Sequence, residues 1–306
     1  MMAAALLLTA MAVSASSGEG FPLAVRDDRG ATIRLAAPPR RVVSLAPSLT
    51  EIVFLLGRQE LLAGVTRYCN FPPPAASLPK VGGVTDPDVE RVVALAPDLV
   101  LCTTDGNPRE KVHALEEMGI PCFAVAPQDL AAVFATIERV GILLGAADRG
   151  RAEAAALRRR ADRARAAGEG DGRDVPRVLF AVSTSPIIAA GAGTFMDELV
   201  RLAGGWNVAA GYSGRYPRLS VEDLVSARPD VVFVAGMAGA ERFPEEVKRW
   251  KEVPAFRDGS VHTLEGDVVT RPGPRLVGAL EQVSAALAAW RAGHAKAVAP
   301  GAGGKR

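Results

Sequence analysis

The chain has 306 residues, of which 49% are hydrophobic and 23% charged, and this size allows two globular lobes with a core each. Such an apolar content excludes a largely disordered chain. Its 36 Lys and Arg residues against 34 Asp and Glu residues leave a net charge of +2, which argues against nucleic acid as a partner.

The first residues have the pattern of a secretory leader. An apolar run from Ala3 to Val13 is followed by small residues, and Val13-Ser14-Ala15 fits a cleavage site. We therefore predict a signal peptide over residues 1–15, although the usual Lys or Arg before the apolar run is missing. The run is shorter than the ~20 apolar residues that span a bilayer. An Ala-rich disordered leader is the alternative.

Strands and helices alternate over residues 40–128, which we predict to form an N-terminal lobe. Ser48 or Thr50 is expected to cap the first helix, and Asp88 to cap a later helix that Pro97 ends. Alternation of this kind is typical of a parallel sheet flanked by helices. The expected strands are RRVVSLA, LLAGVTRY, LVLCT and IPCFAVA, and the expected helices are SLTEIVFLLG, DVERVVALA and REKVHALEEMG.

The alternation stops over residues 129–170, which are predicted to be helical with Gly145 as the one break. The second part, RGRAEAAALRRRADRARAA, contains a single Leu among Ala, Arg and Glu. A long polar helix with few apolar anchors is expected to bridge two lobes as a rigid strut.

From Pro176 the alternation resumes, and we predict a C-terminal lobe over residues 176–275. A closing helix is expected over residues 276–292 and a disordered tail over residues 293–306. The expected strands are PRVLFAV, DVVFVAG and SVHTLEG, and the expected helices are TFMDELVRLAGG and SVEDLVSA; the stretch PEEVKRW leads to the strand SVHTLEG.

One stretch of sequence occurs twice. DVERVVALAPDLV at 88–100 resembles SVEDLVSARPDVV at 220–232, so that Glu90 matches Glu222 and each stretch contains a Pro-Asp pair. Repeats this far apart are not those of a small-repeat solenoid. The chain is therefore interpreted as an α/β protein of two similar lobes with parallel sheets, bridged by a long helix.

The three cysteines, Cys69, Cys102 and Cys122, show no C-x-x-C spacing and cannot all pair. If Cys102 ends one parallel strand and Cys122 begins the next, they lie at opposite ends of the sheet, too far apart for a disulfide. All three are interpreted as small buried side chains.

The loops after the carboxyl ends of parallel strands form the expected binding crevice. All three tyrosines, Tyr68, Tyr212 and Tyr216, lie in such loops, which suggests stacking on a large flat or apolar ligand. Asp267 and Arg271 are candidates for a polar clamp on that ligand. Alternatively, Tyr68 fills the edge of its own lobe, Asp267 is a turn residue and Arg271 an ordinary surface residue.

Catalysis finds little support in the sequence. His113, His262 and His294 have no partners at metal-ligand spacing, no G-x-S-x-G motif occurs, and the GAG at 191–193 lacks the context of a dinucleotide site. We therefore predict no catalytic residue, no metal site and no cofactor. An exported α/β enzyme with an unrecognised site stays as the alternative of another class.

Four stretches together resemble a known family. RRVVSLAPSLTEIVFLLG, GVTRYCNFPPPAASLPKVGG, VERVVALAPDLVL and YPRLSVEDLVSARPDVV are similar to the helical-backbone substrate-binding proteins of ABC importers, which carry cobalamin, haem or ferric siderophores. The Tyr-x-x-Phe-Pro-Pro run is most like the cobalamin branch. The resemblance implies two Rossmann-like lobes (class III), a periplasmic monomer without chemistry of its own, and delivery of ligand to an ABC permease dimer with a cytoplasmic ATPase.

The resemblance also implies which residues contact the ligand. Tyr68, Tyr216, Asp267 and Arg271 match the positions that contact the corrinoid in the cobalamin branch. Val84 departs from the pattern, because a large aromatic residue usually stands there. A haem or ferric siderophore is the alternative ligand, with Tyr68 as an iron ligand.

Glu90 and Glu222 match the residues that, in this family, form salt bridges with arginines of the two permease subunits. A two-lobed protein with matched surface charges can dock onto a symmetric dimer. Alternatively, each glutamate only favours the positive end of its own helix.

Overall fold

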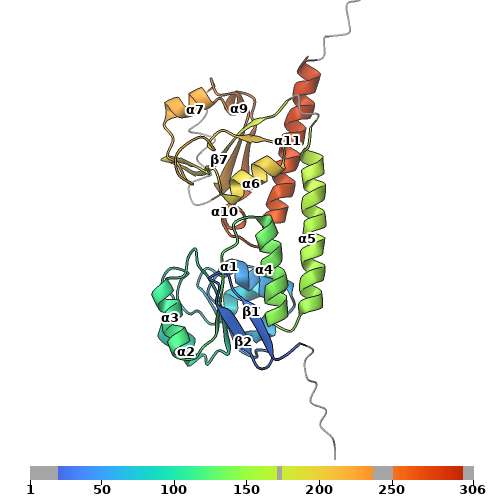
Figure 1. The fold of residues 1–306 in the computed structure, drawn as a ribbon. Helices are drawn as coiled ribbons and strands as arrows, with labels where there is room; N and C mark the ends of the chain where they lie inside the picture. The colour runs from blue at the N-terminus through green and yellow to red at the C-terminus, as the bar shows by residue number, and fades with distance from the viewer. Residues whose placement is uncertain (1–19, 171–173, 237–250, 299–306) are drawn as a thin grey trace, which may run out of the picture.

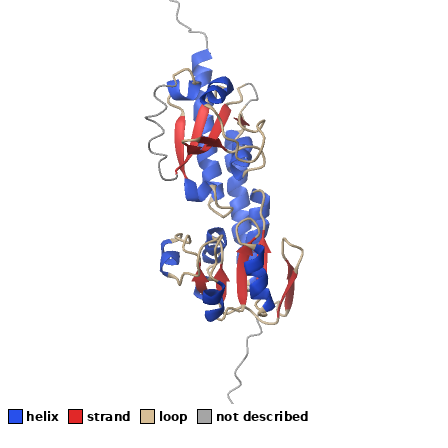
Figure 2. Ribbon diagram, turned by 90° about the vertical axis from the view of Figure 1, so that its left-hand side faces the viewer, coloured by secondary structure: helices blue, strands red, loops and turns tan. Residues whose placement is uncertain are grey.

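The computed structural model describes residues 20–170, 174–236 and 251–298. The chain forms two α/β lobes stacked end to end, with long helices running along one side of both (Figure 1). Figure 2 shows the strands gathered in separate groups, one in each lobe, with helices between them. The predicted two-lobed α/β fold with a helical bridge is thereby confirmed.

The N-terminal lobe contains a four-stranded parallel sheet in the order β4-β3-β5-β6. Its strands are β3 (Val42–Ser44), β4 (Leu62–Val65), β5 (Leu99–Thr103) and β6 (Cys122–Val125). Its helices are α1 (Pro47–Leu55), α2 (Val89–Ala94) and α3 (Arg109–Glu117), with short 3-10 turns η1 (Gln59–Leu61) and η2 (Pro73–Ser77). The buried strands of this sheet are covered on both faces, which explains their continuous Val and Leu runs.

The predicted cap of α1 is wrong, whereas that of α2 is confirmed. Ala46 is the N-cap of α1 without a side-chain bond, because Pro47 occupies the first turn and the helix begins there, before Ser48. Thr50 instead lies buried inside the helix and donates to Ser44 Oγ at 2.9 Å. Asp88 caps α2 by accepting from the backbone N–H of Arg91 at 3.1 Å.

The C-terminal lobe contains a sheet in the order β11-β10-β7-β8, with β9 also paired to β7. Its pairings are parallel except that between β7 and β8, which is antiparallel because two residues join these strands. Its elements are β7 (Arg177–Thr184), β8 (Ile187–Ala189), α6 (Phe195–Leu202), β9 (Trp206–Asn207), α7 (Val221–Ala227), β10 (Val231–Gly236), α9 (Pro254–Arg257), β11 (Val261–Glu265) and α10 (Gly266–Val269). The stretch PEEVKRW lies outside the described residues.

The repeated sequence forms the same structure in each lobe. Asp98 accepts from the backbone N–H of Arg41 at 3.0 Å, and the Arg41 guanidinium donates to Leu95 O. In the other lobe Asp230 accepts from the N–H of Arg177 at 2.9 Å, and the Arg177 guanidinium donates to Ala227 O.

The turn before each Pro-Asp pair is also shared between the lobes. Ala96 and Arg228, which precede the two prolines, adopt positive φ angles of 44° and 42°. The Pro-Asp pairs are therefore structural, as the sequence predicted.

Two antiparallel helices, α4 (Leu130–Leu143) and α5 (Ala147–Gly168), form the bridge between the lobes. The 22 residues of α5 span about 33 Å, which brings it alongside both lobes. Near its start, a Cβ on Gly150 would lie 3.3 Å from the Cα of Gly141 in α4. At its end, a Cβ on Gly168 would lie 2.7 Å from the carbonyl oxygen of Ala203 in the C-terminal lobe. Glycine thus allows close backbone contact at both ends of α5.

The closing helix α11 (Leu276–Val298) packs beside α5 along the C-terminal lobe. Arg160 of α5 donates two hydrogen bonds to Glu281 of α11, at 2.9 and 2.7 Å. The predicted disordered tail is wrong over residues 293–298, which continue α11, and residues 299–306 lie outside the described part. The lower part of the bridge is thus α4 with α5, and the upper part is α5 with α11.

One hydrophobic cluster runs through both lobes along these helices. It joins strands of each sheet to α1, α4, α5, α6 and α11, with Phe123, Ile137, Leu157, Phe180 and Leu280 among its members. The opposite sheet faces pack in two smaller clusters, one in each lobe. Cys69, Cys102 and Cys122 are all buried free thiols, as predicted, and burial raises the pKa of Cys102 to about 12.

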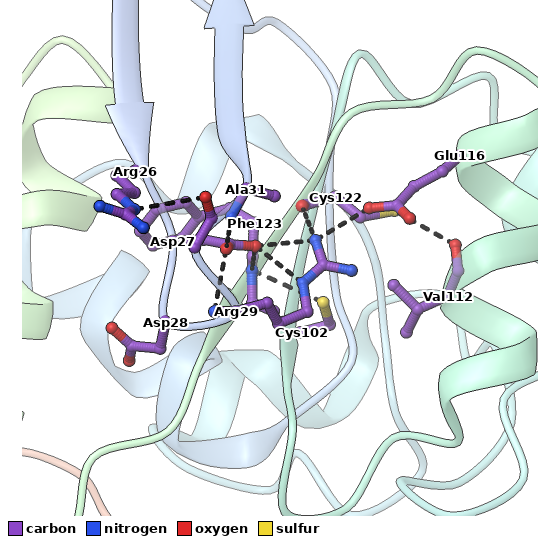
Figure 3. A network of polar contacts seen from close by, with 12 residues as sticks. Arg26, Asp27, Asp28, Arg29, Ala31, Cys102, Val112, Glu116, Cys122 and Phe123 are labelled. Atoms are coloured by element: carbon purple, nitrogen blue, oxygen red, sulfur yellow. Dashed lines mark hydrogen bonds and ion pairs between the residues drawn. The ribbon is translucent and has the colours of Figure 1, made fainter.

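A short hairpin of β1 (Leu23–Arg26) and β2 (Thr32–Leu35) covers the free edge of β6, a feature that the sequence did not suggest. Figure 3 shows the network at its tip. The carboxylate of Asp27 is buried and accepts from the Nε of Arg29 at 2.8 Å. The same guanidinium donates to Glu116 and to the carbonyl of Cys122, both at 2.8 Å. The hairpin is thereby fixed to α3 and to the edge of the sheet.

Candidate functional site

The loop after β4 presents Tyr68 to solvent. The next residue, Cys69, is buried with its sulfur 3.2 Å from the Oγ of Thr50 and 3.1 Å from that of Thr66. This anchor directs Tyr68 outward, so that the residue is 49% exposed. About half of the residue is thus open to solvent. The guanidinium of Arg67 lies 5.3 Å from the ring centroid.

Asp267 and Arg271 follow β11 in the C-terminal lobe and contact the Tyr68 loop of the other lobe. Arg271 Nη2 lies 2.7 Å from Asp267 Oδ2. Asn70 completes a ring, because its amide nitrogen donates to Asp267 Oδ2 at 3.0 Å and its oxygen accepts from Arg271 Nη1 at 2.8 Å. Asp267 is thus not a turn residue alone, and Arg271 is not an unpaired surface side chain.

A second ion pair lies directly behind this ring. Glu51 of α1 is buried and accepts from Arg275 at 2.7 and 3.0 Å, and Arg271 lies 4.0 Å away. Arg275 also donates to Glu265 at 3.0 Å and lies 4.2 Å above the ring of Phe71. We call Glu51, Asn70, Glu265, Asp267, Arg271 and Arg275 the interlobe cluster.

Burial affects the charged groups of this cluster. Burial raises the pKa of Glu51, although hydrogen bonds from Arg275 oppose that shift. Burial alone would lower the pKa of Arg275, but hydrogen bonds to Glu51 and the nearby charge of Glu265 raise it overall. These shifts favour a protonated Arg275, and the pair connects the two lobes in this structure.

The second exposed tyrosine, Tyr216, lies in the loop before α7. This loop runs along β8, since Ala189 and Gly191 donate to the carbonyls of Pro217 and Arg215. Tyr216 is 52% exposed between these contacts. The hydrogen bonds of the interlobe cluster do not include it, so the structure connects three of the four predicted ligand residues, namely Tyr68 through its loop, Asp267 and Arg271. Tyr212 differs, because it is partly buried against the smaller core cluster of the C-terminal lobe and donates to Asp223.

Glu90 and Glu222 occupy the same place in their lobes. Each lies exposed in the first turn of its helix, α2 or α7. These helices lie at the outer ends of the two lobes, on the side away from α5 (Figure 1). Both side chains are therefore free to meet a partner that spans the lobes.

Glu51, Asn70 and Arg275 were not predicted as site residues from the sequence. Glu51 was seen only as a helix residue, and Asn70 only as part of the loop that carries Tyr68. A cavity of about 510 Å³ adjoins Glu51 and Arg275 on the side of α5, and its lining also includes Phe54, Phe71, Leu157, Val268 and Pro274. Within the described ranges, no group of three or more His, Cys, Asp or Glu side chains could hold a metal ion.

Two lobes with α/β sheets, a helical bridge and exposed aromatic and polar groups at the strand ends define a two-lobed binding protein of class III. The family model described as periplasmic binding protein matches residues 42–268, and this chain belongs to that family. Within the described part of the chain, no helix has the length and apolar character needed to cross a bilayer.

The similar proteins include proteins that bind vitamin B12 and proteins that bind heme. The vitamin B12-binding protein of Vibrio parahaemolyticus is 30% identical over 247 residues, which covers 80% of this chain and 88% of that protein. The crystal structure of the periplasmic vitamin B12 binding protein BtuF of Vibrio cholerae has a TM-score of 0.75 at 28% identity, covering 83% of this chain and 98% of that one. The crystal structure of a periplasmic heme binding protein from Pseudomonas aeruginosa has a TM-score of 0.72 at 29% identity. The match covers 82% of this chain and 93% of that one.

Proposed function

We propose that this protein is the substrate-binding component of an ABC importer, that it captures cobalamin or a related corrinoid between its lobes, and that it delivers the ligand to an inner-membrane permease. The arrangement of Tyr68, Asp267 and Arg271 at the junction of the lobes carries the proposal. An exposed aromatic ring suits the flat face of a large macrocycle. The polar pair beside it suits the hydrogen-bonding groups at the rim.

Tyr216 is the proposed contact from the opposite lobe. Its half-exposed ring suits the same macrocycle, since ligand sites are mostly apolar with few polar groups. Two aromatic side chains on separate lobes would hold a ligand across the junction. No catalytic role and no cofactor are proposed, because the corrinoid is cargo.

Glu90 and Glu222 are the proposed contacts with the permease dimer, which works with a cytoplasmic ATPase. Their exposure at matched places on the two lobes supports this role. The protein is proposed to act as a periplasmic monomer, exported by a signal peptide over residues 1–15, a segment outside the described residues.

Calorimetric titration of the purified protein with cyanocobalamin tests the ligand. We expect one molecule bound per chain. Absence of heat at high protein concentration would count against a corrinoid. Tyr68→Ala and Tyr216→Ala should each weaken binding about tenfold or more, as loss of a stacking contact does at other sites.

Haem is the second candidate ligand. The similar heme-binding structures support it, as does the exposed phenol of Tyr68, since a tyrosine can ligate haem iron. A titration with haemin followed by absorption separates the two, because a tyrosine-bound haem changes its Soret band and Tyr68→Phe would abolish that change.

A further inference from the structure

The segment before α7 runs beside β8 as extended chain. The N–H of Leu219 donates to the carbonyl of Ile187 at 2.9 Å. Pro217 and Leu219 are buried in the lobe, whereas Tyr216 and Arg218 are exposed. Side chains two positions apart in extended chain lie on the same face. Arg218 therefore lies beside Tyr216 on the exposed face of this segment.

The segment runs toward the junction of the two lobes. It pairs antiparallel with β8 at the bridge between Arg218 and Ile188, and β8 is antiparallel to β7. The segment is thus parallel to β7, β10 and β11. The carboxyl ends of these strands lie at the junction, because Asp267 follows β11 and contacts Asn70 of the other lobe. Arg218 is therefore about 6–7 Å further along toward the junction than Tyr216.

The guanidinium of Arg218 has no carboxylate partner within the described ranges 20–170, 174–236 and 251–298. Other arginines at the proposed site are paired. Arg67 lies 2.6 Å from Asp86, and Arg271 lies 2.7 Å from Asp267. An anionic group on a ligand would gain less from these compensated charges than from Arg218, where no acid of the described chain competes.

We propose that Arg218 binds an anionic group of the ligand, which in cobalamin is the phosphodiester of the side chain that carries the lower base. The inference rests on the proposed function and adds a contact with a part of the ligand outside the corrin ring. A guanidinium binds phosphate oxygens through charge-assisted hydrogen bonds, often two at once. A corrin stacked on Tyr216 brings a side chain at its edge close to Arg218.

Haem is a second source of the same chemistry. It has no phosphate, but its propionate carboxylates carry negative charge at the edge of a flat ring, and a guanidinium binds carboxylates as well as phosphates. The two sources of the anion differ in what removes them. The corrinoid can be varied at the phosphate alone, which leaves the ring and its stacking unchanged.

Two corrinoids that differ by one phosphate test the contact. Dicyanocobinamide has neither phosphate nor lower base, and dicyanocobinamide phosphate adds the phosphate alone. Calorimetry should give tighter binding of the phosphate to the wild-type protein. Arg218→Gln should weaken binding of the phosphate by roughly tenfold and change that of dicyanocobinamide by less than about twofold.

The matched control is Arg215→Gln, which removes the same charge from the same segment. Arg215 is exposed, but it is three positions from Arg218 and so belongs to the other face of the extended chain. It should change the ratio of the two affinities by less than about twofold. An equal change of that ratio in both variants would mean that general charge determines the preference. No change in Arg218→Gln would mean that Arg218 does not meet the phosphate. Either result overturns the inference while corrinoid binding itself stands.

Failure of the proposed function gives a different result. A wild-type protein that binds neither cyanocobalamin nor dicyanocobinamide would overturn that function and the phosphodiester contact together. If such a protein binds haemin and Arg218→Gln weakens this binding, the anion is a propionate and the phosphodiester is excluded. Both variants should unfold at the midpoint of the wild type, because both side chains are exposed.

Discussion

Glu51 of the first helix and Arg275, near the start of the last, are joined by hydrogen bonds of 2.7 and 3.0 Å across the junction of the two lobes. Glu51 is buried and most of Arg275 is shielded from solvent. The removal of one partner from a buried pair leaves the other charge uncompensated, which costs more than the pair itself contributes.

Glu51→Gln should therefore destabilise the protein by about 3 kcal/mol. Glu281→Gln is the matched control, because it removes the partner of Arg160 from a half-exposed pair at the same junction; it should cost less than about 1 kcal/mol. Urea unfolding followed by circular dichroism measures both. Equal losses in the two variants would show that burial of the Glu51 pair has no special effect.

The contact between Asp28 of the hairpin and Arg139 of α4 should make stability depend on pH. Burial opposes ionisation, but hydrogen bonds from Arg139 and from the N–H of Ala126 hold the pKa of Asp28 below its usual value. A depressed pKa stabilises the fold above the unfolded pKa, and that contribution is lost as the pH falls through the folded value.

Asp28→Asn should accordingly cost about 1–2 kcal/mol at pH 7 and less near pH 3, below the unfolded pKa. Unfolding curves at the two pH values measure this difference. Asp148→Asn, at a fully solvated pair on α5, should have little effect at either pH. A loss for Asp28→Asn that stays constant with pH would contradict the assigned ion pair.

The close contact of Gly168 with Ala203 predicts the effect of a single methyl group. The added Cβ would lie 2.7 Å from a backbone oxygen, so Gly168→Ala should destabilise by about 1–3 kcal/mol. Gly278→Ala in α11 has open space around the added atom and should stabilise by about 0.5–1 kcal/mol. The midpoint of thermal unfolding should thus fall in Gly168→Ala and rise in Gly278→Ala. A change in the same direction in both variants would contradict the contact described at the end of α5.

Glu90 and Glu222, the proposed contacts with the permease, have different neighbours. Arg91 follows Glu90 and pairs with Asp88 at 3.1 Å, whereas Asp223 follows Glu222. The C-terminal lobe therefore presents the more negative contact, and Glu222→Lys should reduce uptake of labelled cyanocobalamin more than Glu90→Lys. Uptake by a strain that lacks its own copy of the protein measures this.

The double variant should abolish uptake while ligand affinity, measured by calorimetry, stays unchanged. Arg159→Glu on α5 is a control for a change of charge away from both helices, and it should leave uptake intact. Normal uptake by the double variant would rule out the docking role of Glu90 and Glu222.

The sequence predicted the features that depend on local pattern. Alternating strands and helices gave the sheets, Asp88 marked the start of α2, and the repeated Pro-Asp pairs marked matched turns in two lobes. The cap of α1 was misassigned, because Pro47 at the first turn is as strong a start signal as Ser48 or Thr50.

The interlobe cluster could not be predicted, since its contacts join residues distant in sequence. Arg275 and Glu51 are separated by 224 positions, and Arg271 and Asn70 by 201. No periodicity relates such residues, and only the packing of the two lobes brings them together. The buried Asp27 was missed for a similar reason, since its role depends on a hairpin that folds against β6.

The way in which α5 is held has a consequence for association with a partner. The helix α5 packs against α4 at one end and against α11 at the other, so it connects the two lobes that carry Glu90 and Glu222. If the proposed docking holds, a permease that has bound one glutamate meets the other at a high effective concentration, so that two weak contacts combine into a stronger one. Dissociation from the permease could then begin with the loss of one of the two contacts, which suits a carrier that must leave after it has delivered its ligand.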